Sequence, residues 1–443
     1  MERRNFLKNT GLAVAGVGLS GFTMPSVFAK GHQPSNKVVV AVAGVNSRGN
    51  GLARMLAQQP NCEVAYICDP DERAMARTVE NVARIQTNNR PKAEKDFRKA
   101  LEDKGVDALV IGMPDHWHAP ASIIALSMGK HVFVEKPFSY DPNEGELLVE
   151  ATKKYNLVVQ MGSQRRSGTG LIQMVKDIRE GIIGNVYMAK TWYANDRGPS
   201  FFKPAAIPSW LDYELWQGPA PRRPYLDGLV HYDWHWLWHW GTGEALNNGI
   251  HEVDVARWGL GVEFPIRVTS IGGRFHHKDD WETPDTQNIS IEFPENKMIT
   301  WEGRSCNKFR VEGADRGVIF YGDKGTIINK GGNSYTAFAA NGRDVIKDSA
   351  DATDSRDTTN PVSAGVNLDQ MHIADFLECI RDGKHPNADA DTGHRSTLLV
   401  QLGNIALRMQ QTLNIDPTNG HILNPGAEKY WKREYERGWE PKV

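Results

Sequence analysis

Two side chains that could do chemistry stand together where a short apolar run ends. The stretch Val132–Pro137 reads Val-Phe-Val-Glu-Lys-Pro, so Glu135 and Lys136 follow the run and a proline closes it. An apolar run of this length before a proline is typical of a buried parallel strand. Ligands of open α/β sheets bind just outside the carboxyl ends of the strands, so Lys136 is predicted to face a crevice. A surface salt bridge at a strand end is the alternative.

A second reactive group is predicted on a helix that begins near Asn247. Residues 247, 251, 254 and 258 share one face at the helical repeat. Asn247 and His251 should therefore face one crevice, with Asp254 near enough to orient the imidazole. An unperturbed histidine has a pKa of ~6.5, so His251 could take a proton at neutral pH. We predict Lys136, His251 and Asp254 as catalytic residues; a structural histidine is the alternative.

The element before these groups is a strand followed by a glycine turn. Residues 37–43 are predicted to form this strand and are apolar from Val38 onward, and Gly44-Val45-Asn46-Ser47-Arg48-Gly49 follows them. This is nearly the dinucleotide fingerprint, in which Gly44 allows the tight turn and Gly49 allows close packing of helix on strand. Asn46 replaces the middle glycine, but asparagine tolerates left-handed backbone and can donate a hydrogen bond. A turn that binds no phosphate is the alternative.

The pattern that follows supports a nucleotide site. A second strand, residues 63–68, ends at Asp69, where a carboxylate accepts hydrogen bonds from ribose hydroxyls and repels a 2′-phosphate. That acid favours NAD over NADP. Strands and helices then alternate, which predicts a doubly wound parallel sheet. The expected segments are a strand at 107–112, a helix at 119–128, a helix at 141–155 and a strand at 157–161.

Three motifs together resemble the Gfo/Idh/MocA oxidoreductase family. They are Pro114 with His118, Glu135-Lys136-Pro137, and the stretch Gly249–Asp254. The resemblance implies an α/β protein, with an N-terminal Rossmann-like doubly wound parallel sheet and a C-terminal α+β domain built on a largely antiparallel sheet. It also implies that Gly184-Asn185-Val186 opens a strand of that second domain. The run around His372, Phe376 and Pro386 is similar to the family's closing helix.

The resemblance assigns residues to two binding sites. The substrate is expected to be a small carbohydrate, and the chain is expected to form a homo-oligomer. The predicted NAD site comprises Gly44, Asn46, Ser47, Arg48, Gly49, Asp69, Pro114, His118, Glu135, Lys136 and Gln164. The predicted substrate site comprises Trp234, His235, Trp236, Asn247 and His251.

Two departures from the family pattern bear on function. Family members often carry an aspartate where this chain has Asn247, and an amide cannot ionise to relay a proton. The Asn-Ser-Arg turn is closer to a branch that includes NAD-dependent glycosidases, among them α-N-acetylgalactosaminidases. The Tyr-Pro-Thr-His segment of that branch does not occur in this sequence, which argues against that particular substrate.

The stretch His231–Trp240 is the densest in aromatic and imidazole groups. If it is extended, alternation places the rings on one face, suited to the apolar face of a pyranose, and the imidazoles on the other, suited to its hydroxyls. An aromatic packing loop is one alternative. A metal site made by the three histidines is another, but no further ligand is marked nearby, and we predict no metal.

The first residues resemble an export signal. Glu2-Arg3-Arg4-Asn5-Phe6-Leu7-Lys8 is a twin-arginine pattern, and a short, glycine-rich apolar run at 12–22 follows it. Cleavage is expected after Ala29, and an amphipathic N-terminal helix is the alternative. The run is too short for a membrane span and no cysteine follows it, so no membrane anchor is expected. The predicted parts are a signal peptide at 1–29, an NAD-binding domain at 37–161, a substrate domain at 162–425 and a C-terminal arm at 426–443.

Composition narrows the remaining choices. The chain has 443 residues and a formal net charge of -2, which argues against nucleic acid or an anionic membrane as the main partner. Cys62 and Cys68 flank one predicted strand and would lie ~20 Å apart, too far for a disulfide, so all four cysteines are predicted to be mostly buried free thiols. Residues 331–367 are rich in glycine and small polar residues, which indicates a long surface excursion.

Together these features predict an exported, periplasmic, NAD-dependent oxidoreductase that acts on a secondary hydroxyl of a sugar or glycoside. The cofactor is expected to stay bound and to be recycled, because little free NAD exists outside the cytoplasm. One alternative is a glycosidase that works by oxidation, elimination, water addition and re-reduction. Another is a sugar- or nucleotide-binding protein without catalysis, which Asn46 and Asn247 favour and which Glu135, Lys136 and His251 oppose.

Overall fold

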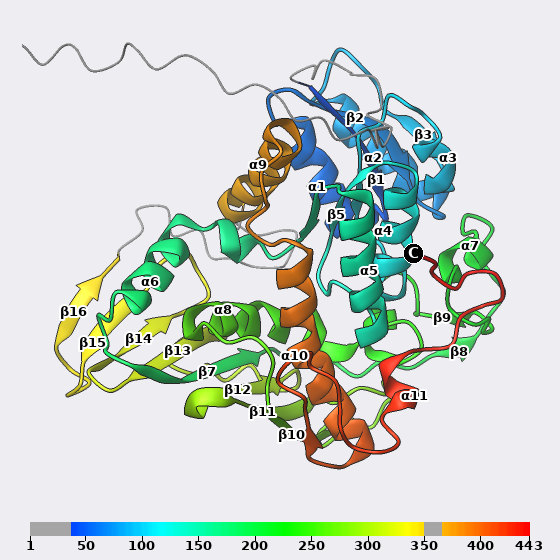
Figure 1. Ribbon diagram of the computed structural model, residues 1–443. Coiled ribbons are helices and arrows are strands. Elements are labelled where there is room, and N and C mark those ends of the chain that lie inside the picture. Colours follow the sequence, from blue (N-terminus) through cyan, green and yellow to red (C-terminus); the bar gives the residue numbers. More distant parts are fainter. Residues whose placement is uncertain (1–36, 350–365) are drawn as a thin grey trace, which may run out of the picture. The chain divides into compact units, whose positions relative to one another are not determined.

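The computed structural model of the protein describes residues 37–349 and 366–443 (Figure 1). The predicted signal peptide, residues 1–29, lies outside these ranges, as do residues 350–365 of the predicted surface excursion. The described residues form two large sheets with their covering helices and a small two-stranded sheet, and they belong to one compact unit.

The first sheet has six parallel strands, and its central strands are rich in buried valine, isoleucine and leucine. Parallel strands covered on both faces read as continuous apolar runs, which is why the sequence pattern finds them. The strand order is that of a doubly wound dinucleotide-binding sheet, so the predicted fold of this half is confirmed. In order along the sheet the strands are β3 (Lys92–Glu94), β2 (Cys62–Cys68), β1 (Val38–Ala43), β4 (Ala108–Ile111), β5 (His131–Val134) and β6 (Val159–Met161).

Helices connect these strands and fix where the turns lie. The side chains of Asp71 and Asp141 accept hydrogen bonds from backbone N–H groups in the first turns of α2 and α5. These caps fix the residue at which each helix begins. The helices of this half are α1 (Arg48–Ala57), α2 (Glu72–Ala83), α3 (Phe97–Leu101), α4 (His118–Ser127) and α5 (Pro142–Tyr155).

The second sheet has nine strands and is mostly antiparallel, as predicted. Within this sheet, the pairing of β7 with β12 is the only parallel one among the described strands. In order along the sheet the strands are β16 (Val345–Asp348), β15 (Thr336–Ala339), β14 (Gly325–Asn329), β13 (Arg316–Gly322), β7 (Val186–Ala194), β12 (Lys297–Arg304), β11 (Thr286–Phe293), β10 (Arg267–Gly273) and β17 (Leu413–Asn414).

Helices α6 (Thr169–Arg179), α8 (Ile250–Leu260) and α10 (Ala390–Met409) pack near this sheet, and α10 also packs on α5 of the first half (Figure 1). Helix α9 (Val366–Asp382) follows the second sheet in sequence, but its apolar residues enter the core of the first sheet. The predicted closing helix is therefore two helices, one for each sheet. Short elements complete the fold: β8 (Lys203–Pro204), α7 (Tyr213–Gln217), β9 (Leu226–Asp227) and α11 (Glu428–Trp431).

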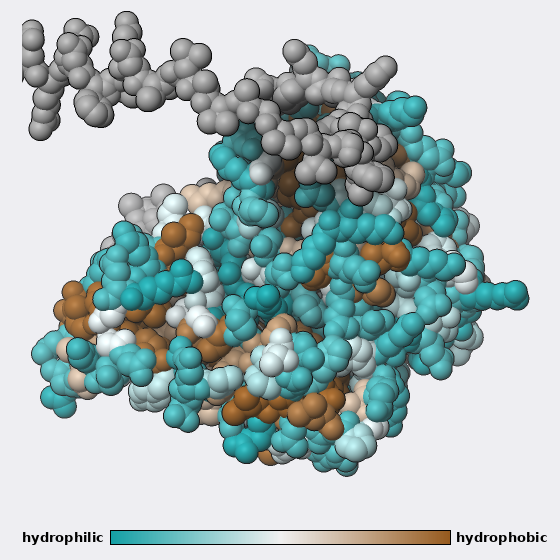
Figure 2. Space-filling model, in the orientation of Figure 1, coloured by the Kyte–Doolittle hydropathy of each residue, from teal (hydrophilic) through white to brown (hydrophobic). Residues whose placement is uncertain are grey.

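The structure adds detail to two segments, the predicted excursion at 331–367 and the C-terminal arm. The predicted excursion at 331–367 contains β15 and β16, because Thr336–Ala339 and Val345–Asp348 extend the second sheet at its edge. Apolar residues reach the surface at that end of the sheet (Figure 2). The C-terminal arm packs on the rest of the protein. Trp439 meets Trp117 edge-on with ring centres 5.1 Å apart, and Trp431 packs against the hydrophobic core of the second sheet.

All four cysteines are free thiols, as predicted, although Cys62 and Cys306 are only half-buried. Among residues 37–349 and 366–443, no helix combines the length and apolar character that crossing a bilayer requires.

Candidate functional site

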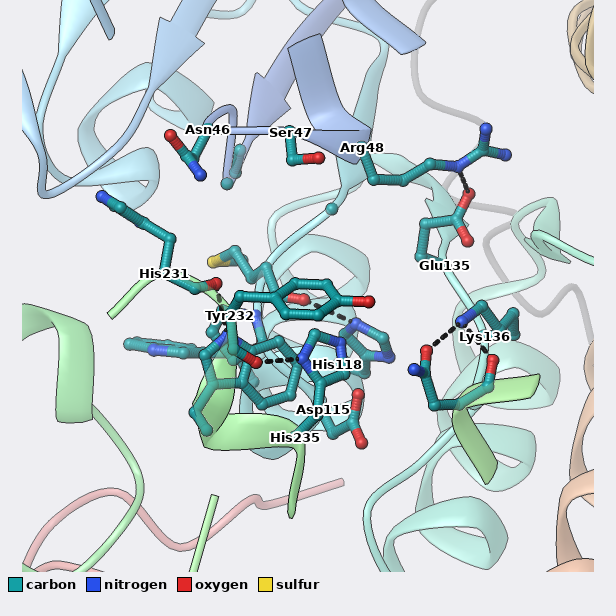
Figure 3. A pocket seen from close by; sticks show the side chains of 18 of the residues that line it. Asn46, Ser47, Arg48, Asp115, His118, Glu135, Lys136, His231, Tyr232 and His235 are labelled. Carbon is teal, nitrogen blue, oxygen red and sulfur yellow. Dashed lines mark hydrogen bonds and ion pairs between the residues drawn. The ribbon is translucent and has the colours of Figure 1, made fainter. Parts of the chain in front are cut away.

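A cavity of about 470 Å³ lies at the carboxyl edge of the first sheet and is closed by residues of the second domain (Figure 3). It brings together most of the predicted site residues, from the glycine turn to the helix of His251. The predicted residues that line it are Gly44, Asn46, Ser47, Arg48, Asp69, Pro114, His118, Glu135, Lys136, Gln164, Trp234, His235, Asn247 and His251. Gly49, Trp236 and Asp254 are not among its lining residues.

The glycine turn has the geometry that its residue types predict. Gly44 has a φ of +78°, and an added Cβ would lie 2.5 Å from the backbone nitrogen of Met113. An added Cβ at Gly49 would lie 2.0 Å from the carbonyl oxygen of Gly44, so Gly49 serves close packing and does not line the cavity. Both positions therefore require glycine.

The start of α1 suits a pyrophosphate. Ser47 precedes the helix, and its side chain makes no capping hydrogen bond to α1. The first N–H groups of a helix carry partial positive charge and bind phosphate oxygens. The turn and Ser47 therefore fit the phosphates of NAD, although Asn46 replaces the usual middle glycine.

Asp69 lies at the end of β2, where the ribose site is predicted. Its two carboxylate oxygens accept hydrogen bonds from the backbone N–H groups of Val45 (2.6 Å) and Asp71 (2.8 Å). Burial raises the pKa of Asp69 to about 6. Each oxygen keeps a further lone pair for a ribose hydroxyl, so the same carboxylate can hold the glycine turn and the cofactor.

We expect Asp69→Ser and Asp69→Asn to relax the preference for NAD over NADP by roughly tenfold or more, ~1.4 kcal/mol, because the carboxylate repels a 2′-phosphate. Arg77 already contacts Asn46 at 2.7 Å and would supply a cation for that phosphate. The dissociation constants of both cofactors are the measurement. An unchanged ratio in both variants would remove Asp69 from the ribose site.

Arg48 begins α1, but its guanidinium is bound by two carboxylates. It contacts Glu135 at 2.7 Å and forms two hydrogen bonds with Asp369 of α9, at 2.8 and 2.7 Å. Figure 3 shows Arg48 turned toward Glu135. The side chain of Arg48 therefore ties together α1, the end of β5 and α9, and its role at the pyrophosphate stays a prediction.

His118 lines the cavity at the predicted nicotinamide side. Its ring nitrogens lie 2.6 Å from the carbonyl oxygen of Pro137 and 2.8 Å from that of Met113. Both contacts are to backbone, so the ring holds together the turns that follow β4 and β5. Pro114 and Glu135 belong to the same two turns.

Lys136 points into the cavity and contacts the second domain. Its Nζ donates to the backbone carbonyl of Asn247 at 2.6 Å and to the side-chain oxygen of Asn247 at 3.0 Å (Figure 3). Asn247 lies in a π-helical turn, Ala245–Gly249, and such widened turns are frequent at functional sites. Burial lowers the pKa of Lys136 from 10.5, while Glu135 and Asp115 oppose that shift.

His251 is buried at the cavity, and neither ring nitrogen has a hydrogen-bond partner within the described residues. Burial lowers the pKa of His251 well below 6.5, and the charges of Lys136 and Arg316 lower it further. These shifts disfavour protonation of His251 at neutral pH, contrary to the expectation from the sequence. A neutral imidazole offers one donor and one acceptor, which suits a substrate hydroxyl.

The prediction that Asp254 orients His251 is wrong. The Asp254 carboxylate pairs with Arg166 at 2.7 Å and accepts hydrogen bonds from Ser163 and Ser396. Arg166 lowers the pKa of Asp254 to about 2. Asn247 and His251 face the cavity, as predicted for one side of the helix, but Asp254 does not. Its carboxylate instead ties α8 to α10 and to the chain after β6.

The stretch His231–Trp240 is not extended. Asp233–Trp236 forms a turn of 3₁₀ helix, so successive side chains point in different directions instead of alternating. Trp234 and His235 stack with ring centres 3.6 Å apart and line the cavity. Trp236 is buried behind them against Trp281, with ring centres 4.0 Å apart, and is therefore not a substrate contact.

The three histidines of this stretch go to separate partners. His231 contacts Asp71 at 2.7 Å, His235 contacts the backbone carbonyl of Tyr232 at 2.6 Å, and His239 contacts that of Pro221 at 2.7 Å. Within the chain that the structure describes, no group of three histidine, cysteine or acidic side chains is placed to hold a metal ion.

The cavity also contains polar residues that sequence reasoning did not find. Arg197 donates to Glu244 at 2.6 Å and to the Tyr232 hydroxyl at 2.9 Å, and Figure 3 shows the Tyr232 ring across the middle of the cavity. Asp115, buried beside Lys136, accepts a hydrogen bond from Thr242 at 2.5 Å. Tyr193, Asn195 and Asn248 complete this group. Only Asp115 carried a signal, its place directly after Pro114.

Comparisons with known proteins agree with this architecture. Residues 38–163 match the oxidoreductase family with an NAD-binding Rossmann fold, and residues 175–413 match the C-terminal alpha/beta domain of the same oxidoreductase family. A glycosyl hydrolase family 109 protein from Shewanella pealeana is 25% identical over 215 residues, which are 44% of this chain and 46% of that relative. The match thus spans about half the length of the curated relative.

Two solved structures illustrate the shared fold. The WlbA dehydrogenase from Bordetella pertussis, solved with NADH and UDP-GlcNAcA, is 17% identical with a TM-score of 0.63, covering 86% of this chain and 98% of its own. A levoglucosan dehydrogenase, solved with NADH and levoglucosan, is 17% identical with a TM-score of 0.66, covering 85% of this chain and 99% of its own. At this identity the likeness shows the fold.

Proposed function

Because the chain belongs to the Gfo/Idh/MocA family of oxidoreductases and carries that family's NAD-binding Rossmann domain, we propose that it oxidises a secondary hydroxyl of a sugar or glycoside. One observation carries this proposal. A single cavity joins the glycine turn and Asp69 to the side chains of Lys136, Asn247 and His251. A cofactor and a small substrate would therefore meet beside Lys136.

Lys136 is the residue proposed to hold the hydroxyl proton. Bound NAD supplies the hydride acceptor, and the protein supplies orientation and proton transfer. Burial lowers the pKa of Lys136, so a larger fraction of its amine is neutral and able to accept a proton. The two oxygens of Asn247 fix the position of Nζ. Neutral His251, with no partner for its ring nitrogens among described residues, is proposed to hydrogen-bond the same hydroxyl or its neighbour.

The wall of the cavity suits a carbohydrate. Tyr232 and the stacked pair of Trp234 and His235 present ring surface, which packs on the apolar face of a pyranose. Arg197, Asn195 and other polar groups lie among these rings and can bind hydroxyls.

The second domain also closes over the predicted ribose end. The backbone of Trp210 accepts a hydrogen bond from Glu72 at 3.1 Å, and that of Asp212 donates to Pro70 at 3.0 Å. His231 contacts Asp71 across the same junction. These contacts support the proposal that NAD is held tightly and recycled, because its release would require them to open.

The direct experiment begins with the purified protein. We expect native mass spectrometry to find one dinucleotide per chain, and we expect sugars or glycosides from a panel to change the absorbance of the bound nicotinamide. If no dinucleotide is bound and none can be loaded, a sugar-binding protein without catalysis replaces this proposal.

A glycosidase is the second candidate, favoured by the similarity to a glycosyl hydrolase family 109 protein. In this reaction oxidation of C3 makes the C2 proton acidic, the C1 substituent is eliminated, water adds, and C3 is reduced again. Product analysis separates the two functions. A free aglycone without net oxidation indicates the glycosidase, whereas an oxidised sugar or a reduced second sugar indicates the oxidoreductase.

Export by the twin-arginine route is proposed from the first residues. Arg3→Lys combined with Arg4→Lys should leave precursor in the cytoplasm, because the route reads the arginine pair. Fractionation of cells with an immunoblot is the measurement, and a single change between the predicted cleavage site and the first domain, Asn36→Ser, is the control. Mature protein outside the cytoplasm in the double variant would show that this signal is not used.

A further inference from the structure

A second cavity, of about 370 Å³, lies outside the site described above. Four parts of the chain form it: the loop around Arg223, the segment with Trp238 and His239, the end of α10 at Arg408, and the C-terminal arm from Lys429 to Glu434. Tyr140, which follows the Glu-Lys-Pro turn, closes one side and hydrogen-bonds the backbone carbonyl of Trp238.

The charges around this cavity are unbalanced. Its lining includes five cationic side chains and two carboxylates, Asp141 and Glu434. Two of the cations are neutralised, because Arg222 pairs with Glu214 and Arg433 pairs with Glu144. Arg223, Arg408 and Lys429 have no ion pair with any described residue. The cavity therefore carries net positive charge.

Arg408 is held in a geometry that leaves its donors open. Its guanidinium lies 4.8 Å from the ring centre of Trp238 and 4.6 Å from that of Tyr430. Stacking on aromatic faces fixes the plane of a guanidinium and leaves its N–H groups at the edge. These N–H groups donate no hydrogen bond to another described residue. They can therefore donate two parallel hydrogen bonds to a planar or tetrahedral oxyanion.

A second arginine supports the same ligand class. The side chain of Arg433 is only 9% exposed, and its Nε and Nη1 have no hydrogen-bond partner within the described chain. Buried donors without partners are rare and call for a ligand or ordered water.

We propose that this cavity binds a small oxyanion, either a phosphate group or the carboxylate of an acidic sugar, through Arg408 and Arg223. The site is separate from the NAD cavity, but the two share chain segments. Trp234 and His235 line the first cavity and Trp238 and His239 the second, while Lys136 and Tyr140 stand at the two ends of one turn.

Isothermal titration calorimetry of the full-length protein tests this proposal with two probes, inorganic phosphate and glucuronate, at constant ionic strength. Arg408→Gln and Arg223→Gln should each weaken binding about tenfold or more, and Arg408→Lys should recover only part of the affinity, because an ammonium lacks the fork. The matched control is Arg343→Gln, an exposed arginine outside both cavities, which should bind as the parent does.

Binding of phosphate alone identifies a free phosphate or phosphate-ester site, and binding of glucuronate alone identifies an acidic-sugar site; both support the proposal. It is overturned if neither probe binds, or if Arg408→Gln and Arg223→Gln bind as tightly as Arg343→Gln. Thermal melting of each variant establishes that it is folded. Arg408 and Arg223 are exposed, so their substitution should leave the melting temperature nearly unchanged.

Discussion

Lys136→Ala is expected to keep its NAD and to lose ~10²–10⁴-fold of its turnover rate, the usual contribution of a positioned acid or base. The side chain lines the cavity together with the predicted nicotinamide residues, and Asn247 fixes it there. Lys136→Arg should fail as well, because a guanidinium stays protonated and cannot accept the hydroxyl proton. Steady-state kinetics with the sugar found by screening, and cofactor content by mass, are the measurements.

The rate of oxidation is also expected to depend on pH in a definite direction. Oxidation requires the neutral amine, and the pKa of Lys136 is lowered from 10.5 by burial. The rate of oxidation should therefore rise with pH through a pKa below 10.5, and this step should vanish in Lys136→Ala. If the pH profile of the rate were the same in Lys136→Ala, another group would accept the hydroxyl proton.

His251→Ala is the second substitution with a large expected effect. We expect it to retain NAD and to lose about 10²-fold in turnover, the usual cost of removing one preorganised donor at a reacting oxygen. Because the pKa of His251 lies well below 6.5, its loss should leave the pH profile unchanged near neutral pH. A lost pH step in that range would restore His251 as the base.

Asn247→Ala is the matched comparison for both residues. It removes the side-chain oxygen at 3.0 Å from Nζ of Lys136 but keeps the backbone carbonyl at 2.6 Å. We therefore expect a loss of about tenfold, smaller than for Lys136 or His251. A larger loss in Asn247→Ala than in His251→Ala would mean that this face of the helix has been assigned the wrong way round.

The first sheet could be predicted from the sequence because its strands are continuous apolar runs between short turns. The glycine turn, Asp69 and the Glu-Lys-Pro turn each follow one of those strands, so their meeting at one edge follows from the parallel topology. Helix α9 could not be placed in this way. Its apolar face reads the same whichever sheet it covers, and only the fold shows that Phe376 enters the first core.

Local patterns failed where the backbone departs from a regular repeat. The π-helical turn at Ala245–Gly249 and the approach of Arg166 to Asp254 break the helical face predicted for His251. A single turn of 3₁₀ helix divides the aromatic stretch, so Trp234 faces the cavity while Trp236 is buried. Arg197 comes from the chain after β7, and no sequence spacing relates it to the other site residues.

The proton step at Lys136 requires hydride transfer from a sugar carbon to the cofactor in this cavity, and an isotope label on that carbon follows the transfer directly. The NAD-loaded protein is mixed with a reactive sugar that carries deuterium at the oxidised carbon, without an added electron acceptor, and the nicotinamide is analysed by mass spectrometry after the oxidation half-reaction. We predict that the deuterium appears on the nicotinamide in the parent protein and, at the same time point, to a much smaller extent in Lys136→Ala. A product formed without label on the nicotinamide, or equal labelling in both proteins, would contradict the account.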